Sequence, residues 1–369
     1  MKVLFLALAK HQKNYFQSLL DTTELQGRVV VPAELPLPDL SAIGRAMARI
    51  DWHSLIEEKC RERAVKKRYN GWLYRLLLKL ELLVMALRFA ALLGKEQADA
   101  VAVWNGGHRY CSLLTSICGP EVRTFYFENG LLPNTTTLDP RGVNYRNSVP
   151  RDEAFYLDYA RSHSAKASSG EEVRLIPRKP RVEGGAAVEL PERFIFIPFQ
   201  DDRDTQVRLF SPWVRDMREL FAFAERLVSE LGLPVVLKEH PSSRETYPDL
   251  HERVSDKLFF ANQNSTQQLI ESSQLVITLN STVGLESILL GKRVLTLGLA
   301  FYNIDGLVLH GDSASEALEL VRQSPDWQPD AETRQGFLAY LHDEYCVPGA
   351  WASAGQAHRL EVARRMCNS

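Results

Sequence analysis

Several features that mark specialised classes of protein are missing from this 369-residue sequence. The net charge is only −2, so the chain as a whole is not a polyanion binder, and a charged partner must meet a local patch. The sequence contains no C-x-x-C pair, which excludes the common zinc spacing and argues against a disulfide framework. This cysteine usage fits a reducing compartment. The five cysteines are Cys60, Cys111, Cys118, Cys346 and Cys367.

Long hydrophobic runs are also missing. The first apolar run, Val3 to Ala9, is short and is not followed by a convincing cleavage site, so we expect a buried strand rather than a signal peptide. The longest run, Leu80 to Leu93, contains Glu81 and Arg88 and is too short to span a bilayer. We therefore expect a cytoplasmic protein. If it attaches to a membrane, we expect it to do so peripherally, at the inner face.

The composition is that of an ordinary globular protein, with 45% hydrophobic and 24% charged residues, and the length suits two domains. Apolar segments typical of strands alternate with helical patterns in both halves, which predicts parallel sheets covered on both faces. The expected strands are 3–8, 28–31, 98–104, 123–127, 194–198, 235–237, 258–260, 275–279 and 293–297. The expected helices are 12–20, 54–93, 110–118, 212–231, 266–273, 282–290, 313–323 and 355–366.

This pattern predicts an α/β protein made of two doubly wound, Rossmann-like domains that face a cleft. We expect an N-terminal domain over 1–150 and a C-terminal domain over 192–352. Residues 151–191 are rich in Ser, Lys, Gly and Pro, which predicts a linker or long loop. Residues 353–369 should form a C-terminal helix that packs back on the N-terminal domain.

Acidic residues crowd the end of one predicted strand, in "IFIPFQDDRDTQV". Gln200 is followed by Asp201, Asp202 and Asp204, whose carboxylates repel one another. One explanation is a solvated turn in which an acid caps the following helix. Another is an aspartate that acts as a nucleophile or base. A metal-binding D-x-D is a weaker option, because no further ligand is spaced to complete a coordination shell.

A second strand ends on a base, an acid and an imidazole, in "PVVLKEHPSS". Lys238 supplies a point charge and His240 a hydrogen-bond donor, which together suit an anion. Pro241 fixes the direction in which the chain leaves the strand. The alternative is a surface histidine beside a turn.

A third strand leads into a helix through hydroxyl-bearing residues, in "LVITLNSTVGLES". The sequence Asn280–Ser281–Thr282 at a helix N-terminus predicts a phosphate site, and Val283 and Gly284 should keep the first turn narrow enough for a ligand to approach closely. Glu286 follows one turn later. An ordinary Ser/Thr N-cap is the alternative. Two anion-suited strand ends in one half of the chain favour a site for a nucleotide phosphate.

The first half carries a polar loop in "FENGLLPNTTTLDPRGVNYRNS". Glu128 follows an aromatic strand, and Arg141 and Asn144 could hydrogen-bond a polyhydroxylated, anionic ligand. A structured surface loop is the alternative interpretation.

The segments "FENG", "RGVN", "QDDRDTQV", "KEHP", "LNSTVGLES" and "FYNIDGL" resemble, in order and rough spacing, those of the bacterial capsule and lipopolysaccharide Kdo transferases. Kdo is a keto sugar with a carboxylate at its reacting carbon. The resemblance covers about 123–307. It implies a GT-B glycosyltransferase that uses CMP-Kdo and retains configuration, forming a β-linkage through a covalent adduct on an aspartate. It also implies that the N-terminal domain binds the acceptor and the C-terminal domain binds the nucleotide sugar.

The resemblance also implies roles for single residues. Asp204 matches the nucleophile, with Gln200 as its partner and Asp202 as the second choice, because this sequence has extra acids. Glu128 matches an acid/base that faces the acceptor. The residues that resemble CMP-binding elements of related transferases are Lys238, His240, Pro241, Asn280, Ser281 and Thr282. The resemblance implies no metal and no cofactor beyond the donor substrate.

Residues 61–79 carry seven Lys or Arg against a single Glu, with aromatic and leucine residues interleaved. This composition predicts either a helix with a solvated basic face and an apolar core face, or a helix that docks on an anionic membrane surface. No nucleic-acid recognition motif accompanies the patch.

Three rival functions follow from the same residues. The first is a GT-B transferase that uses another nucleotide sugar, and the second is a non-catalytic scaffold of an assembly complex. The third is a metal-dependent phosphoesterase built on "DDRD".

Overall fold

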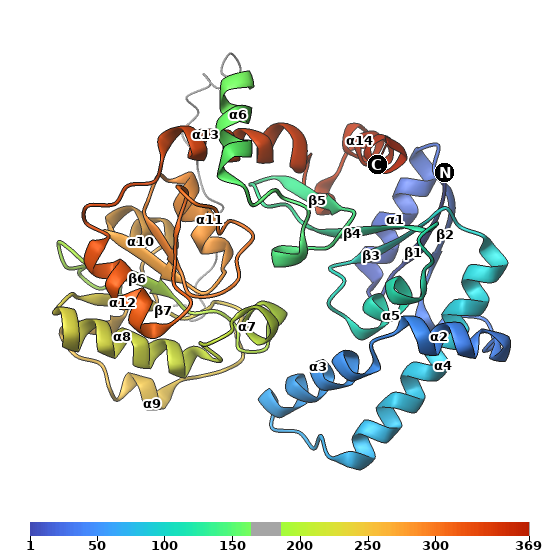
Figure 1. Ribbon diagram of the computed structural model, residues 1–369, viewed down its shortest axis with the longest axis horizontal. Coiled ribbons are helices and arrows are strands. Elements are labelled where there is room, and N and C mark those ends of the chain that lie inside the picture. The colour runs from blue at the N-terminus through green and yellow to red at the C-terminus, as the bar shows by residue number, and fades with distance from the viewer. Residues whose placement is uncertain (164–185, 369) are drawn as a thin grey trace. The chain divides into compact units, whose positions relative to one another are not determined.

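The computed structural model describes residues 1–163 and 186–368, which divide into two compact units (Figure 1). Unit 1 comprises Met1–Ser148 and Tyr345–Ser369, and unit 2 comprises Val149–Glu344. Each unit is built on its own six-stranded sheet.

The sheet of unit 1 has the strand order β12-β5-β4-β3-β1-β2. β1 to β4 are parallel, whereas β5 is antiparallel to β4 and β12 is antiparallel to β5. The prediction of a wholly parallel sheet is therefore wrong at this edge, where a short connection lets the chain fold back as a hairpin. The strands are β1 (Lys2–Leu6), β2 (Gln26–Val30), β3 (Ala100–Trp104), β4 (Arg123–Asn129), β5 (Thr135–Asp139) and β12 (Val347–Pro348).

Helices cover both faces of this sheet, as the alternation predicted. Val3 and Phe5 of β1 pack toward α1 and α14, whereas Leu4 and Leu6 pack toward α4 and α5 (Figure 1). This division follows from the alternation of side chains along a strand. The helices of unit 1 are α1 (Lys10–Thr22), α2 (Ile43–Arg49), α3 (Trp52–Val65), α4 (Trp72–Glu96), α5 (Arg109–Ile117) and α14 (Gln356–Asn368).

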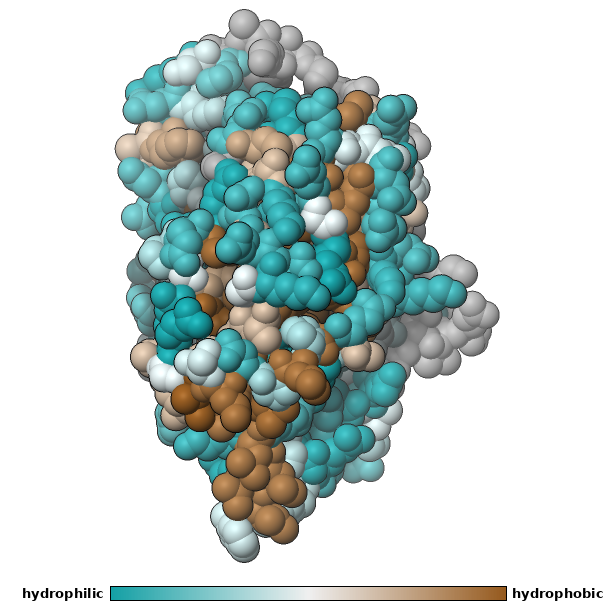
Figure 2. All heavy atoms as spheres, turned by 90° about the vertical axis from the view of Figure 1, so that its right-hand side faces the viewer, coloured by the Kyte–Doolittle hydropathy of each residue, from teal (hydrophilic) through white to brown (hydrophobic). Residues whose placement is uncertain are grey.

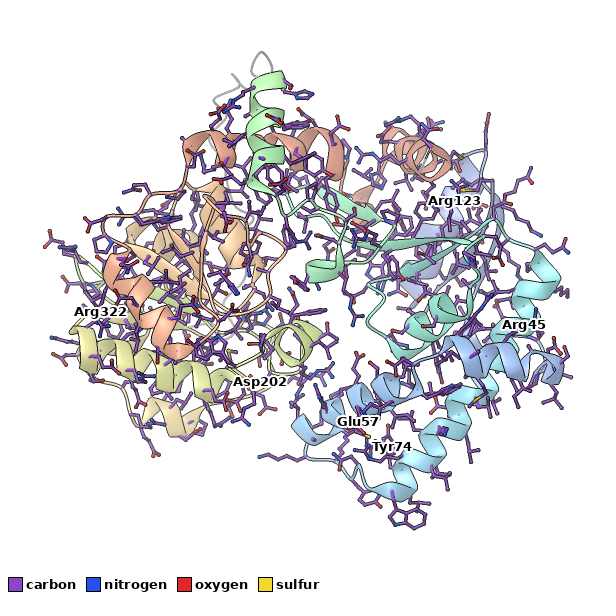
Figure 3. All side chains as sticks on the ribbon, in the orientation of Figure 1. Arg45, Glu57, Tyr74, Arg123, Asp202 and Arg322 are labelled. Carbon is purple, nitrogen blue, oxygen red and sulfur yellow. The ribbon has the colours of Figure 1, made fainter. Side chains whose placement is uncertain are left out.

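The helical pattern over 54–93 forms two helices rather than one. α3 ends at Val65, and α4 begins at Trp72. Lys67 adopts a positive φ of 51° between them, which ends the first helix. Arg75 of α4 pairs with Glu57 of α3 and holds the two helices together; Figure 3 shows Glu57 and Tyr74 between them.

The sheet of unit 2 is parallel throughout, with the order β11-β10-β9-β6-β7-β8. α8 and α12 cover one face, and α10 and α11 lie on the other (Figure 1). The strands are β6 (Ile195–Pro198), β7 (Val235–Lys238), β8 (Leu258–Phe260), β9 (Leu275–Thr278), β10 (Val294–Thr296) and β11 (Leu309–His310). The helices are α6 (Glu153–His163), α7 (Thr205–Phe210), α8 (Met217–Leu231), α9 (Pro248–His251), α10 (Thr266–Ser272), α11 (Thr282–Leu289), α12 (Ala314–Gln323) and α13 (Ala331–Tyr340).

The linker predicted over 151–191 is wrong for its first part, because Glu153–His163 forms α6. α6 packs on α13, and Gly336 makes the close approach possible: a Cβ there would lie 2.0 Å from the Tyr156 carbonyl oxygen. Residues 164–185 lie outside the described residues. After them, the backbone of Val188 exchanges hydrogen bonds with the Asn264 side chain, so this end of the segment is tied to unit 2.

The structure sets the domain boundaries at Val149 and Tyr345. The chain thus returns to unit 1 before the predicted residue 353, because β12 joins the first sheet by pairing with β5. α14 then packs on α1. Two Rossmann-like α/β units are what the sequence predicted for the fold class.

Candidate functional site

Three polar strand ends lie next to one another in unit 2. β6 is the neighbour of both β7 and β9, and all three strands run parallel. The segments that follow them therefore leave the sheet at the same, carboxyl edge, where ligands of such sheets bind. The sequence predicted these three segments as candidates, and the topology brings them together.

The end of β6 is joined to the end of β9 by a pair of amide side chains. The Gln200 Nε2 donates to Asn280 Oδ1 at 3.0 Å, and the Asn280 backbone N–H donates back to Gln200 Oε1 at 3.3 Å. Asn280 Nδ2 also donates to the backbone oxygens of Gln206 and Phe210, each at 3.0 Å. Both side chains are buried. They hold α7 against the end of β9, so any part in ligand binding is indirect.

Asp202 is buried at the start of α8 (Figure 3). One carboxylate oxygen accepts from the Met217 backbone N–H at 2.9 Å, and the other accepts from the Tyr247 hydroxyl at 3.0 Å. Burial raises the pKa of Asp202 to about 6, and these two hydrogen bonds partly oppose that rise. Its oxygens are thus engaged within unit 2.

Asp204 is exposed and caps α7, as the N-cap interpretation predicted. Its Oδ1 accepts from the Gln206 backbone N–H at 2.9 Å. Among the described residues, no donor is found for its Oδ2. An exposed carboxylate with one uncommitted oxygen can reach a ligand, which distinguishes Asp204 from Asp202.

The end of β7 is tied to the loop after β8. Lys238 Nζ donates to the backbone oxygens of Asn262 at 2.6 Å and Asn264 at 2.7 Å, and burial lowers the pKa of Lys238. Glu239 pairs with His251 at 2.7 Å, which gives this acid a structural role. Lys238 thus serves the fold as well as any ligand.

His240 comes next, before the turn that begins at Pro241. Its Nδ1 accepts from the Ser242 backbone N–H at 3.3 Å. That bond makes Nδ1 the acceptor and leaves Nε2 as the ring's N–H donor when the imidazole is neutral.

α11 begins immediately after the end of β9. Ser281 is its N-cap, and its hydroxyl accepts from the Val283 backbone N–H at 3.1 Å. Thr282 is the exposed first residue, and Glu286 lies one turn on. The expectation that Gly284 leaves room for a ligand is wrong, because a Cβ there would lie 2.2 Å from the Tyr302 hydroxyl oxygen. Tyr302 fills that space and donates to the Ser281 carbonyl oxygen at 2.6 Å.

Glu128 lies near the end of β4 in unit 1. Its Oε2 accepts from Asn105 Nδ2 at 2.5 Å, and its Oε1 accepts from the Asn129 backbone N–H and side chain at 2.9 and 3.0 Å. Asn105 follows β3 with a positive φ of 63°. These hydrogen bonds fix the position of the Glu128 carboxylate. Asn105 is not among the site residues predicted from the sequence, although "WNGG" is a polar turn directly after a strand.

The loop with Arg141 and Asn144 is organised by a buried acid. Asp139 accepts from the backbone N–H groups of Arg141 and Gly142 and from Ser148, and Tyr345 donates to it at 2.8 Å. This network confirms a structured loop. The Arg141 side chain is exposed, and Asn144 adopts a positive φ of 56°. Asp139 itself is therefore a structural group.

Residues 1–163 and 186–368 contain no group of three or more His, Cys, Asp or Glu side chains arranged to hold a metal ion. Within the same residues, no helix is long and apolar enough to cross a membrane.

Sequence comparison links the chain to capsule polysaccharide proteins. Residues 180–343 match the family described as capsule polysaccharide biosynthesis protein. Protein FixF of Sinorhizobium fredii is 37% identical, over 68% of this chain and 61% of FixF. The capsule polysaccharide export protein KpsS of Escherichia coli is 27% identical, over 60% of this chain and 70% of KpsS. The chain thus spans about three fifths of the length of FixF.

Structural comparison finds the same fold in two solved transferases of Thermosulfurimonas dismutans. Its KpsC β-Kdo 2,7 transferase matches with a TM-score of 0.51 at 12% identity, over 99% of this chain and 100% of that chain. Its KpsC β-Kdo 2,4 transferase matches with a TM-score of 0.50 at 15% identity, over 91% of this chain and 89% of that chain. The predicted GT-B-like fold class is confirmed, and so is the resemblance to the capsule polysaccharide Kdo-transferase family.

Proposed function

Because residues 180–343 match the family described as capsule polysaccharide biosynthesis protein, we propose that the chain is a retaining glycosyltransferase that moves Kdo from CMP-Kdo to a glycan or lipid-linked acceptor. The observation that carries the proposal is the carboxyl edge of the unit 2 sheet. There, one exposed carboxylate, one imidazole and one helix N-terminus follow three neighbouring parallel strands. A nucleophile and a phosphate site are what transfer from CMP-Kdo requires.

The first step uses Asp204 as the nucleophile. One of its carboxylate oxygens bonds to the anomeric carbon of Kdo as the bond from that carbon to the CMP phosphate oxygen breaks. The electron pair of that bond leaves with CMP. The Nε2–H of His240 and the N-terminus of α11 after Ser281 stabilise the charge that develops on the phosphate.

The second step uses the acceptor. Its hydroxyl oxygen bonds to the same carbon, the bond to Asp204 breaks, and the carboxylate is restored. A general base accepts the hydroxyl proton, which is the role that the resemblance to the Kdo transferases gives to Glu128. Two displacements at one carbon retain its configuration.

A donor screen without acceptor tests this proposal. Incubation with CMP-Kdo should release CMP, and Asp204→Asn should slow the release by about three orders of magnitude. Asp201→Asn is the matched control, because its Oδ1 accepts from the Arg203 backbone N–H, a bond that an asparagine can keep. Release of UDP from UDP-sugars in place of CMP, or no turnover with any donor, would contradict the proposal in favour of another transferase or a scaffold.

We further propose that unit 1 docks on an anionic membrane surface through α4. The side chains on the outward face of this helix are between 45% and 73% exposed, although they are large and apolar. The helix also has the apolar core face that was one of the two predictions, because Leu78 and Leu82 are buried in unit 1. Figure 2 shows apolar side chains gathered over the lower part of this face of the molecule, where α4 lies. These residues, which we call the α4 stripe, are Trp72, Leu73, Leu76, Leu77, Leu80 and Val84.

The charges around the α4 stripe favour lipid over a protein partner of mixed charge. The acids Glu57, Glu62 and Glu81 are neutralised by ion pairs. Lys67, Arg68 and Lys79 are exposed and form no ion pair within the described part of the chain. An apolar helix face flanked by unpaired cations and a tryptophan is typical of interfacial helices.

Sedimentation with vesicles tests this docking. Vesicles that contain anionic phospholipid should carry the protein down at low salt. Lys67→Glu/Arg68→Glu and Leu76→Ser/Leu77→Ser should each abolish binding, whereas Leu360→Ser, an exposed leucine on α14, should not. Equal binding by either double variant and the wild type would remove the proposal.

A further inference from the structure

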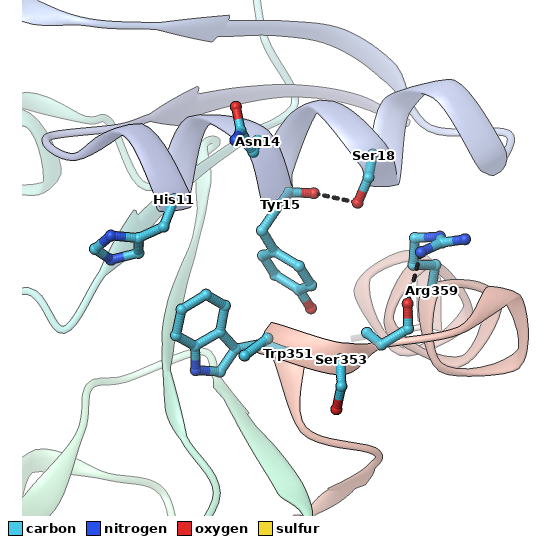
Figure 4. Close-up of a pocket in the computed structure, with 9 residues that line it drawn as sticks. His11, Asn14, Tyr15, Ser18, Trp351, Ser353 and Arg359 are labelled. Carbon is cyan, nitrogen blue, oxygen red and sulfur yellow. Dashed lines mark hydrogen bonds between the residues drawn. The ribbon is translucent and has the colours of Figure 1, made fainter.

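A polar and aromatic pocket of about 460 Å³ opens in unit 1, and all of its lining residues belong to that unit (Figure 4). One wall is the first half of α1, and the other is the segment from Trp351 to Arg359 just before and within α14. Its lining includes His11, Asn14, Tyr15, Trp351, Ser353 and Arg359.

Aromatic rings form the inner surface of the pocket. The Trp351 ring centroid lies 5.4 Å from that of His11, 6.1 Å from that of Tyr15 and 4.8 Å from that of Trp104 behind it. The indole N–H is already used, since it donates to Asn129 Oδ1 at 2.8 Å. Trp351 is thus fixed in place and has no free polar atom, so it can offer a ligand only an apolar surface.

Tyr15 is fixed by a relay of hydrogen bonds. His358 Nδ1 lies 2.7 Å from the Pro348 carbonyl oxygen, which requires a proton on Nδ1 and makes Nε2 an acceptor. The Tyr15 hydroxyl therefore donates to Nε2, at 2.8 Å. Burial lowers the pKa of His358, so the imidazole stays neutral at physiological pH. The Tyr15 hydroxyl is consequently occupied, and its ring is held rigidly.

A cation without a carboxylate partner completes the pocket. Arg359 Nε donates to Thr22 Oγ1 at 2.9 Å, and one terminal nitrogen donates to the Ala354 carbonyl oxygen at 2.7 Å. Both acceptors are neutral, and no ion pair of Arg359 is found among residues 1–163 and 186–368. The guanidinium is therefore held in one place with its charge uncompensated and with donors to spare. Anionic ligands suit such a group, and a carboxylate can use two of its N–H groups at once.

The pocket is connected to the proposed acid/base. Trp351 contacts Asn129, and Asn129 donates to Glu128. Trp104, against which Trp351 packs, is the register partner of Phe127, the residue before Glu128. A ligand bound against Trp351 would therefore lie at the same end of the unit 1 sheet as Glu128.

We propose that this pocket is an acceptor subsite that binds a carboxylated sugar unit, whose ring lies against Trp351 and whose carboxylate pairs with Arg359. Rigid aromatic faces suit the C–H groups of a sugar ring, and Asn14 and Ser353 offer hydrogen bonds to its hydroxyls. The role of the bound sugar as an acceptor rests on the proposed function, whereas the binding itself does not.

A matched pair of ligands tests the pocket without any donor. Methyl galacturonoside and methyl galactoside differ in the carboxylate, and their binding to the full chain can be measured by saturation-transfer NMR. The carboxylated sugar should bind at least about tenfold more tightly than the neutral one. Equal affinity for both, or no binding of either, would overturn the proposal.

Variants locate that binding. Arg359→Gln should remove the preference for the carboxylated sugar and Arg359→Lys should keep part of it, whereas Arg364→Gln, on the same helix but outside the pocket, should change nothing. Trp351→Phe should weaken both sugars while its circular dichroism stays native. Unchanged binding in Arg359→Gln would overturn the assignment.

Kinetics distinguishes failure of the subsite from failure of the proposed function. Arg359→Gln should raise the KM for a carboxylated acceptor roughly tenfold, whereas Arg364→Gln should change neither that KM nor CMP release from CMP-Kdo in the absence of acceptor. Normal CMP release with an unchanged acceptor KM would overturn the subsite alone. Absence of CMP release from the wild type, with sugar binding intact, would overturn the proposed function alone.

Discussion

The Trp351 indole N–H donates a hydrogen bond to the Asn129 side-chain oxygen at 2.8 Å. Trp351 belongs to the C-terminal segment that returns to unit 1, whereas Asn129 ends β4. Asn129 in turn donates to the Glu128 carboxylate at 3.0 Å. The last part of the chain therefore fixes the orientation of an acid more than two hundred residues before it.

This relationship predicts energetic coupling between the two residues. Trp351→Phe and Asn129→Ala should each lower the free energy of unfolding by about 1 kcal/mol, and the double variant should lose less than the sum. Urea unfolding of the four proteins gives the coupling. Trp213→Phe, whose indole donates to Gly311 in unit 2, should be additive with Asn129→Ala. Full additivity of Trp351→Phe and Asn129→Ala would refute the coupling.

Gly284 should be intolerant of even one methyl group. Its added Cβ would meet the Tyr302 hydroxyl at 2.2 Å, and moving Tyr302 breaks its hydrogen bond to the Ser281 carbonyl oxygen. We expect Gly284→Ala to lower the unfolding free energy by about 2 kcal/mol. Gly44→Ala is the control, since a Cβ on this helical glycine meets nothing within 4 Å. Equal stability of the two variants in urea would show that Tyr302 is not constrained as described.

Removal of the Lys238 side chain should lower the stability of the protein, whereas removal of the His240 side chain should lower the rate of CMP release. Lys238→Met removes two charged hydrogen bonds to partly buried backbone oxygens and should destabilise the protein by about 3 kcal/mol. His240→Asn keeps an acceptor for the Ser242 N–H but removes Nε2, so it should lower the rate of CMP release. An unchanged melting temperature in Lys238→Met would contradict the first assignment, and CMP release at the wild-type rate in His240→Asn would contradict the second.

The buried carboxyl group of Asp202 should make the unfolding free energy depend on pH. Burial raises its pKa in the folded protein from an ordinary 3.8 to about 6, so the folded state binds the proton more tightly than the unfolded chain does. The associated stability is complete below pH 3.8 and is lost as the pH rises to about 6, by roughly 3 kcal/mol.

A comparison with Asp202→Asn isolates this group. The unfolding free energy of the wild type should fall relative to that of the variant between about pH 4 and pH 6, and the difference should be constant above that range. Denaturant unfolding of both proteins across this range measures it. A wild type that gains stability relative to the variant as the pH rises would contradict the assignment of Asp202 as a buried, hard-to-ionise acid.

Short-range patterns predicted the strand ends at Gln200, Lys238 and Asn280, because an apolar strand followed by polar residues is visible in a few consecutive letters. Their adjacency followed from parallel topology. The residues that these side chains contact could not be predicted in the same way, because they are distant in the sequence. Lys238 donates to the loop that follows the next strand. Tyr302 occupies the space that a side chain at position 284 would need.

The antiparallel edge of the first sheet escaped prediction for a related reason. β12 consists only of Val347–Pro348, which is too short to give a strand pattern in the sequence. It pairs with β5, which lies far away in the sequence. α6 was missed because its residues precede a Ser- and Gly-rich stretch, and its burial depends on contact with α13. Such contacts are set by tertiary packing rather than by local sequence.

Mass spectrometry of the protein incubated with CMP-Kdo and no acceptor tests the central claim most directly. A rapidly quenched sample should carry one Kdo adduct, located on the peptide that contains Asp204, and Asp204→Asn should carry none. An adduct on Asp202, an adduct that persists in Asp204→Asn, or no adduct while CMP is released would contradict the account.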